Sequence, residues 1–202
     1  MDIAVALVAL ILLSPVFLVV AIAIKLTSPG PILFRGTVHG KNGKAFTYYK
    51  FRSMVAGGDT SQHQDFIRRY VQEGGGHEDA ETGEKVYKLT GDPRVTTVGK
   101  IIRRLSIDEF PQMLNVLRGD MSVVGPRPPV PYEYELYDDA KKLRLLVKPG
   151  ITGLNQVRRR GNAAFEDMYA DDLEYIRRQS ILLDLYIIFK TPFVMLFGAG
   201  PT

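Results

Sequence analysis

The segment SIDEFPQ, residues 106–112, places two carboxylates side by side just before a short apolar stretch. Ser106 and Glu109 have the spacing of a capping box, in which both side chains bond free amides at a helix start. Pro111 opposes a helix that begins at Ser106, because the proline ring would meet the carbonyl four residues earlier. We therefore expect the helix to begin at Asp108 or Glu109, although the capping box stays open as an alternative.

Adjacent carboxylates suit phosphate chemistry, because one can bind a hard divalent cation while the other acts on phosphorus. Asp108 and Glu109 alone would repel a pyrophosphate. Arginines remove that barrier, and Arg103 and Arg127 flank the pair along the chain. We interpret these four residues as the chemical centre.

The composition limits the classes of protein and site that are possible. The 202 residues are 46% hydrophobic, enough for one domain with its own core. There is no cysteine, which excludes disulfides and thiolate metal sites, and the three histidines are scattered, which disfavours zinc. The net charge of +4 suits anionic partners, but tryptophan and any basic arm are missing, so nucleic acid is not expected.

Residues 3–24 carry no charged side chain and are long enough to cross a bilayer as a helix. Ser14 and Pro15 lie in the middle, where the proline should kink or break the helix and the serine hydroxyl can satisfy freed backbone groups. Two topologies follow: a kinked spanning helix, or a re-entrant hairpin that leaves by the leaflet it entered. The residues alone slightly favour the spanning helix.

A β-hairpin should follow the membrane segment. Residues 32–35 and 45–51 read as its strands, and Asn-Gly at 42–43 signals a tight turn. Lys50 and Arg52 close the second strand and could hold phosphates, or could form a solvated strand edge. Residues 57–90 are polar and glycine-rich, with helical spacing at 66–71. We interpret that segment as a surface insertion or a lid.

The remaining chain is expected to be mostly helical, which gives an α+β fold. We divide it into a membrane segment, residues 1–30, and a catalytic domain, residues 31–202. The acidic pairs at 138–139 and 171–172 are interpreted as solvated helix faces. The expected helices are 98–105, 113–117 closed by Gly119, 130–146, 165–178 and an interfacial or core-packed 181–197, with an extended loop at 125–129, a turn at 148–153 and a short strand or helix start at 154–157.

The ordered motifs over nearly the whole chain resemble those of the bacterial sugar transferases, the monotopic phosphoglycosyl transferases. The catalytic core is most similar to the undecaprenyl-phosphate glucose and galactose phosphotransferases. The motifs are Ser14-Pro15, Ser28-Pro29-Gly30-Pro31, Lys50-Phe51-Arg52-Ser53-Met54, Asp92-Pro93-Arg94, Arg103 with Asp108-Glu109-x-Pro111-Gln112, Asn115-Val116-Leu117-Arg118-Gly119-Asp120-Met121-Ser122, Gly125-Pro126-Arg127-Pro128 and Lys148-Pro149-Gly150-Ile151-Thr152-Gly153.

The resemblance implies transfer of a sugar 1-phosphate from a UDP-sugar to polyprenyl (undecaprenyl) phosphate, with release of UMP. This reaction initiates synthesis of a surface polysaccharide or glycoconjugate. Asp108 would be the nucleophile and form a phosphosugar ester, and Glu109, with Asp108, would hold Mg²⁺. Arg103 and Arg127, and also Lys50 and Arg52, would contact phosphate.

The resemblance also implies a location and partners. The N-terminal segment would be re-entrant, with the Ser14-Pro15 break at its turn. The catalytic domain would lie on the cytoplasmic face of the bacterial inner membrane, in contact with membrane lipid, and the chain could form a homodimer. A membrane-anchored nucleotide-sugar hydrolase and a non-catalytic scaffold are the alternative functions.

Overall fold

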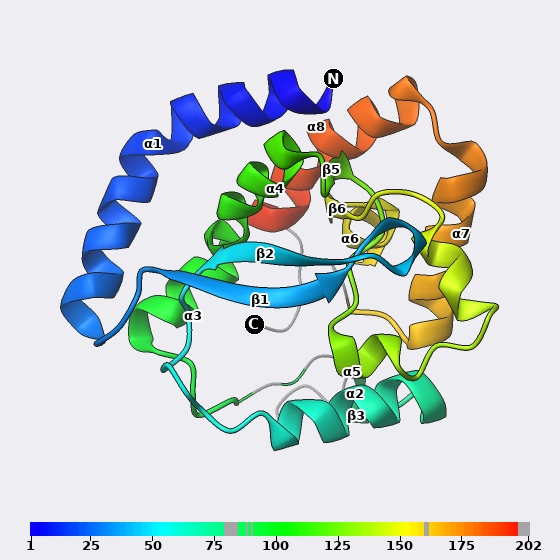
Figure 1. Ribbon diagram of the computed structural model, residues 1–202, viewed down its shortest axis with the longest axis horizontal. Helices are drawn as coiled ribbons and strands as arrows, with labels where there is room; N and C mark the ends of the chain where they lie inside the picture. The colour runs from blue at the N-terminus through cyan, green and yellow to red at the C-terminus, as the bar shows by residue number, and fades with distance from the viewer. Residues whose placement is uncertain (79–84, 88, 90, 160–161, 198–202) are drawn as a thin grey trace.

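The computed structural model of the chain describes residues 1–78, 85–87, 89, 91–159 and 162–197. Figure 1 shows an antiparallel hairpin crossing the middle of the molecule, with helices around it and one long helix arching along the edge. The sheets in the described part of the chain each contain two strands. The expected α+β class, mostly helical with a small hairpin, is confirmed.

The elements follow the chain with mostly short connections. The helices are α1 Asp2–Thr27, α2 Ser61–Glu73, α3 Thr97–Arg104, α4 Met113–Arg118, α5 Pro131–Tyr134, α6 Leu154–Arg159, α7 Phe165–Arg178 and α8 Ile181–Phe197, with 3₁₀ helices η1 Lys41–Gly43, η2 Ile107–Gln112 and η3 Lys141–Leu145. The strands are β1 Leu33–His39, β2 Ala45–Phe51, β3 His77–Glu78, β4 Lys85–Val86, β5 Ser122–Val124 and β6 Gly150–Thr152.

Helix α1 carries Pro15 in its middle and yet remains one helix. The Ser14 hydroxyl donates to the carbonyl oxygen of Ile11 at 2.8 Å, and this is the carbonyl that Pro15 leaves without an amide partner. Figure 1 shows the axis of α1 changing direction part-way along. The expected helix–break–helix is therefore corrected to a bent, continuous helix, because Ser14 satisfies the acceptor that a break would expose.

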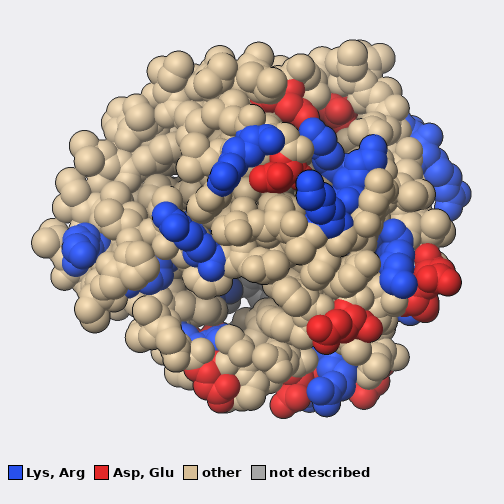
Figure 2. Space-filling model, viewed as in Figure 1, with Lys and Arg blue, Asp and Glu red and all other residues tan. Residues whose placement is uncertain are grey.

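Both halves of α1 lie against the rest of the chain. Ala6 and Ile24 are buried in two different core clusters, and the Asp2 carboxylate accepts the amide of Val123 at 3.4 Å. The helix is long and apolar enough to cross a membrane. Its other side exposes Ile3, Leu7, Val8, Ile11, Leu12, Val16, Leu18, Val19, Ile22 and Leu26. In Figure 2 the upper edge formed by α1 carries almost no charged side chains.

The predicted hairpin is confirmed with a tight turn at Asn42 and Gly43. β1 and β2 pair in antiparallel register from Leu33 opposite Phe51 to His39 opposite Ala45. Asn42 and Gly43 both have positive φ angles, 58° and 73°, which the Asn-Gly pair adopts with little strain. This register brings Lys50 to the strand end that faces η2.

Asn115 fixes the position of β2 from the side. Its side chain is fully buried, accepts the amide of Tyr49 at 3.1 Å and donates to the carbonyl of Thr47 at 2.7 Å. One amide side chain thus pairs with the backbone of β2 as a neighbouring strand would. Because α4 carries Asn115, this contact joins the hairpin to the helix that follows the acidic pair.

We expect Asn115→Ala to destabilise the protein by about 1–3 kcal/mol, because two backbone groups lose their partners. The free energy of unfolding measured by urea titration checks this value. Gln72→Ala is the reference variant, because Gln72 is an exposed residue of α2. A second asparagine, Asn162, is less suitable as a reference because it also makes contacts. Equal stability of the two variants would contradict the role assigned to Asn115.

The segment expected to be a simple turn, residues 148–153, contains a strand. β6 runs parallel to β5, with Ser122 opposite Gly150 and Val124 opposite Thr152. A side chain at Gly150 would collide with the amide of Gly125, so the two backbones meet only because both residues lack a Cβ. Three-residue strands of this kind have no periodicity to reveal them in the sequence.

The predicted single helix over residues 130–146 is wrong. α5 ends after four residues, turns follow, and η3 begins at Lys141. The Asp138 side chain accepts the amide of Lys141 at 2.8 Å, which stabilises a turn in place of a continuing helix. The expected helices at 98–105, 113–117 and 165–178 are confirmed, with Gly119 in the left-handed conformation after α4. At 154–157, where a short strand or helix start was expected, the chain forms α6.

Two further helices complete the core. α2, in the polar segment, buries Ile67, Tyr70 and Val71 in a cluster with Phe165 and Met168 of α7. α8 buries Ile187 in the cluster that also contains Ala6. α8 also exposes the apolar side chains Ile181, Leu182, Tyr186, Phe189 and Phe193. Its contact with the membrane interface stays a prediction.

Candidate active site

The acidic pair lies in η2, a 3₁₀ helix that begins at Ile107 and not at Asp108 or Glu109 as expected. Ser106 has a positive φ of 51° and makes no side-chain capping bond, so the capping box does not form. The 3₁₀ geometry accommodates Pro111, because the carbonyl four residues earlier no longer points at the proline ring. The Glu109 side chain is consequently free to turn away from Ser106.

Glu109 forms an ion pair with Lys50 of β2. The Lys50 Nζ lies 2.8 Å from Glu109 Oε1, with the two side chains 24% and 37% exposed. Asp108, the neighbouring acid, is only 7% exposed. The Lys50 ammonium also lies 5.4 Å from the ring centre of Tyr48. The hairpin therefore contributes the cation and η2 contributes the two carboxylates.

The environment separates the pKa values of the two acids. Burial, with the like charge of Glu109, raises the pKa of Asp108 to about 6, against the opposing effect of Lys50 and Arg103. Burial would also raise the pKa of Glu109, but Lys50 and Arg127 outweigh it and lower that pKa. Burial opposes the charge of Lys50, yet Glu109 and its neighbours raise the pKa of the ammonium overall. Glu109 is thus ionised at neutral pH, whereas Asp108 has a pKa of about 6.

A large, open cavity of about 3020 Å³ contains this site. All four predicted phosphate-binding residues, Lys50, Arg52, Arg103 and Arg127, line it together with Asp108 and Glu109. Apolar side chains from the inner side of α1 line the same cavity, including Val5, Leu10 and Phe17. The cavity therefore joins charged groups suited to phosphate with an apolar wall suited to a hydrocarbon chain.

Phe17 of α1 contacts the residue that follows each member of the ion pair. Its ring centre lies 5.7 Å from that of Phe51, next to Lys50, and 6.1 Å from that of Phe110, next to Glu109. These ring contacts connect the bent part of α1 to both sides of the ion pair. The position of the membrane helix and the geometry of the acidic pair are thus coupled.

Arg52, the fourth predicted phosphate contact, has another role in the structure. It is 4% exposed, and its guanidinium donates to the carbonyl and hydroxyl of Ser28 at 2.8 and 2.9 Å and to the carbonyl of Pro29. These acceptors bind Nη1 and Nη2 of the guanidinium. Arg52 thus attaches the end of α1 to the hairpin, and its contact with phosphate stays a prediction.

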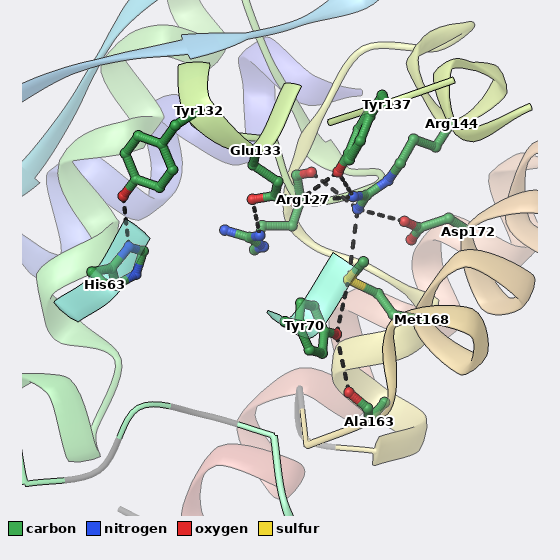
Figure 3. Close-up of polar contacts among 10 residues, drawn as sticks. All are labelled: His63, Tyr70, Arg127, Tyr132, Glu133, Tyr137, Arg144, Ala163, Met168 and Asp172. Carbon is green, nitrogen blue, oxygen red and sulfur yellow. Dashed lines mark hydrogen bonds and ion pairs between the residues drawn. The ribbon is translucent and has the colours of Figure 1, made fainter. Parts of the chain in front are cut away.

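A buried network holds Arg127 and was not expected from the sequence (Figure 3). Arg127 Nη2 lies 2.6 Å from Glu133 Oε2, and Tyr137 donates to Glu133 Oε1 at 2.6 Å. Arg144 Nη1 donates to the Tyr137 hydroxyl at 2.5 Å, and Arg144 Nη2 lies 2.6 Å from Asp172 Oδ2. Glu133 and Arg144 are fully buried.

The interpretation of 171–172 as a solvated helix face is wrong. Asp171 and Asp172 are each 3% exposed; Asp171 pairs with Arg158 at 2.8 Å, and Asp172 belongs to the network of Arg144. One signal was present, because Asp172 continues the apolar spacing of Phe165, Met168 and Tyr175 on α7. The other acidic pair, Asp138 and Asp139, is exposed as expected.

The acidic pair offers oxygen donors of the kind that Mg²⁺ prefers, and binding of the ion stays a prediction. In the described part of the chain, no group of three or more histidine or acidic side chains could hold a metal ion. Mg²⁺ is commonly bound by one or two carboxylates and completes its six positions with phosphate oxygens and water. Asp108 and Glu109 supply such a pair, with oxygens as the only donors.

Comparison with known proteins identifies the family. The family described as bacterial sugar transferase matches residues 1–198. The chain is 43% identical over 190 residues to the exopolysaccharide production protein ExoY of Sinorhizobium fredii, covering 94% of this chain and 81% of that protein.

Longer relatives match over part of their length. The chain is 40% identical over 200 residues to the UDP-glucose:undecaprenyl-phosphate glucose-1-phosphate transferase of Escherichia coli, covering 95% of this chain and 38% of that protein. It is 39% identical over 200 residues to the undecaprenyl-phosphate galactose phosphotransferase of Salmonella typhimurium, covering 98% of this chain and 40% of that protein. The chain therefore belongs to the bacterial sugar transferase family and is a transferase enzyme.

Proposed function

We propose that the protein moves a sugar 1-phosphate from a UDP-sugar to polyprenyl phosphate, with release of UMP. One observation carries the proposal: the buried Asp108 carboxylate faces a cavity that contains phosphate-binding cations and the apolar wall of α1. Relatives named for undecaprenyl-phosphate sugar phosphotransfer support it. Such a transfer would initiate the synthesis of a surface polysaccharide.

The transfer is proposed to take two displacements at phosphorus. The Asp108 carboxylate attacks the β-phosphorus of the UDP-sugar, the bond from that phosphorus to the bridging oxygen breaks, and UMP leaves with the electron pair. An oxygen of polyprenyl phosphate then attacks the same phosphorus, and the bond to Asp108 breaks and regenerates the carboxylate. Arg103, Arg127 and Lys50 neutralise the phosphoryl oxygens during both steps.

Asp108 and Glu109 would hold Mg²⁺, which when bound supplies further neutralisation of the pyrophosphate. Glu109 stays ionised at neutral pH because Lys50 lowers its pKa, so it is ready to bind the cation. The burial that raises the pKa of Asp108 also removes water from its carboxylate, which makes the carboxylate a stronger nucleophile. The two neighbouring acids thus have separate roles.

The assay that tests this function incubates the purified protein with UDP-sugars, Mg²⁺ and undecaprenyl phosphate and follows UMP. UMP release that depends on the lipid is expected. Without lipid, the first displacement can release at most one UMP per protein molecule, so continued release without lipid would indicate the nucleotide-sugar hydrolase. No release with UDP-glucose, UDP-galactose or UDP-N-acetylgalactosamine would indicate the scaffold.

The rate should depend on pH through Asp108. With a pKa of about 6, kcat/KM should rise about tenfold per pH unit below that value and become constant above about pH 7. Lys50→Met should move the acid limb to higher pH, because the ammonium lowers the pKa of Asp108. Glu109→Gln should move it to lower pH, because a like charge is removed. Profiles in which both variants keep the wild-type limb would contradict this assignment.

We further propose that α1 is re-entrant and that the domain lies on the cytoplasmic face of the inner membrane. The support is that both ends of α1 contact the same body, at Val123 and at Arg52, while its outer side is apolar. The chain has no cysteine, so one cysteine added before Met1 and one from Asp139→Cys can be labelled separately. Both should react from the cytoplasmic side; periplasmic labelling of the first would indicate a spanning helix. A homodimer stays a prediction.

A further inference from the structure

Arg127 is held at two points by one buried cluster, which we call the Glu133 cluster: Glu133, Tyr137, Arg144 and Asp172. Glu133 Oε2 pairs with the Arg127 guanidinium at 2.6 Å, and Arg144 Nη2 donates to the Arg127 carbonyl at 3.2 Å. We propose that Glu133 is a positioning residue, which aims the Arg127 guanidinium at the phosphate of the donor. This inference rests on the proposed function and extends it to residues outside the cavity's charged centre.

The Glu133 carboxylate cannot turn away from Arg127. Its other oxygen, Oε1, accepts the Tyr137 hydroxyl at 2.6 Å and lies 3.5 Å from Arg144 Nη1. Arg144 in turn pairs with Asp172 on α7 at 2.6 Å. Since Glu133 and Arg144 are fully buried, each has no alternative partner in solvent. Arg144 thus connects Asp172 of α7 to Oε1 of Glu133.

Arg127 and Asp172 both line the cavity, and Arg127 is the cation of the pair. Its side chain is 43% exposed, whereas that of Glu133 is completely buried. Figure 3 shows the Arg127 guanidinium beside Glu133, with Tyr132 and His63 to the left and Tyr137, Arg144 and Asp172 to the right. An arginine side chain free in solution samples many rotamers, and an ion pair to a fixed carboxylate removes most of them. The guanidinium is therefore oriented before a phosphate arrives.

The loop that carries Arg127 is fixed by the same contacts. Prolines at 126, 128 and 129 restrict its backbone, and Arg144 holds the carbonyl of Arg127 itself. Two cations, Arg127 and Arg144, meet two anions, Glu133 and Asp172, so the charges balance. The network thus leaves the nitrogens of Arg127 that face the cavity available for a phosphate oxygen.

Rescue by free guanidinium distinguishes positioning from general stability. Arg127→Ala should lower kcat/KM for the donor by about 10²–10³-fold, as loss of a phosphate contact does. Millimolar guanidinium should raise kcat/KM of Arg127→Ala at least about tenfold, because Glu133 holds the added ion where Arg127 had its guanidinium. In Arg127→Ala with Glu133→Gln, the restoration should be less than about twofold.

Two matched variants control for a general loss of stability. Asp171→Asn also neutralises a buried, arginine-paired acid, but it lies outside the Glu133 cluster; combined with Arg127→Ala, it should leave the rescue intact. Should Glu133→Gln fail to fold, Glu133→Asp keeps the charge and withdraws the carboxylate by one methylene. At saturating guanidinium, Arg127→Ala with Glu133→Asp should then reach a lower rate than Arg127→Ala.

The results of these experiments distinguish failure of the positioning role from failure of the proposed function. Equal rescue of Arg127→Ala with and without the change at Glu133 overturns the positioning role while the proposed function stands. Loss of rescue with Asp171→Asn also overturns it, because the effect would then be one of stability. A wild-type protein that turns over no UDP-sugar contradicts the proposed function and, with it, this inference.

Discussion

Asp108→Asn is expected to abolish UMP release, with a loss of about 10³-fold or more in rate. The amide has nearly the shape of the carboxylate, so the 7% exposed side chain should still fit its site. The amide cannot form the bond to phosphorus, so the first displacement does not occur. Without lipid acceptor, mass spectrometry should find a phosphosugar adduct on the wild-type protein and none on Asp108→Asn.

The same variant should be more stable than the wild type at neutral pH. Folding raises the pKa of Asp108 from 3.8 to about 6, so the carboxylate form is disfavoured in the folded state. The wild type therefore loses stability as the pH rises from about 4 to about 6, and an uncharged asparagine avoids this loss. The gain above pH 6 is on the order of 2–3 kcal/mol, measurable by urea unfolding at pH 4 and pH 8.

One result would contradict the role of Asp108. A phosphosugar adduct that persists in Asp108→Asn would place the nucleophile elsewhere. A loss of activity that comes with unfolding would leave the adduct experiment without meaning, so the melting temperature is measured first. Glu109→Gln is the matched control, because it should slow the adduct but still form it.

Arg144→Met is expected to be the most destabilising single change, at about 3–5 kcal/mol. The arginine is fully buried between Glu133 and Asp172, and its removal leaves two buried carboxylates with too few cations. For a chain of this length the melting temperature should fall by about 6–20 °C. Arg178→Met is the control: Arg178 is 67% exposed, and loss of its pair with Glu174 should cost less than about 1 kcal/mol.

The loss should depend on pH in a defined direction. Burial already raises the pKa of Asp172, and without Arg144 that pKa rises further. Protonation then removes the unpaired charge, so the difference between Arg144→Met and the wild type should shrink as the pH falls. Adding Glu133→Gln and Asp172→Asn to Arg144→Met should recover part of the stability. A constant difference at every pH would show that lost packing, and not lost charge, is responsible.

Local signals predicted the hairpin and several helices because they depend on neighbours in the sequence. Asn42-Gly43 fixes its own turn, and residues 165–178 repeat with helical spacing. The candidate site was predicted in the same way, since Asp108 and Glu109 are adjacent and Arg103 is close to them in the sequence. Lys50 was placed correctly because the strand register follows from the turn.

Long-range contacts account for what the sequence did not show. β5 and β6 are three residues each and pair only because Gly125 and Gly150 let the backbones approach. Arg52 reads as another basic residue near Lys50, but its acceptors lie on the segment after α1. Residues 130–146 carry helix-forming side chains, but the Asp138 side chain accepts the amide of Lys141 and stabilises a turn there.

The position of α1 has a consequence for the order of events during synthesis. This helix is synthesised before the segments against which it packs, because Ala6 shares its core cluster with Ile187 of α8. Until α8 has been made, the inner side of α1 has no complete set of partners, and an exposed apolar helix in water would aggregate. The lipid bilayer can hold the newly made helix during that interval. The membrane would then act as a folding environment as well as a destination.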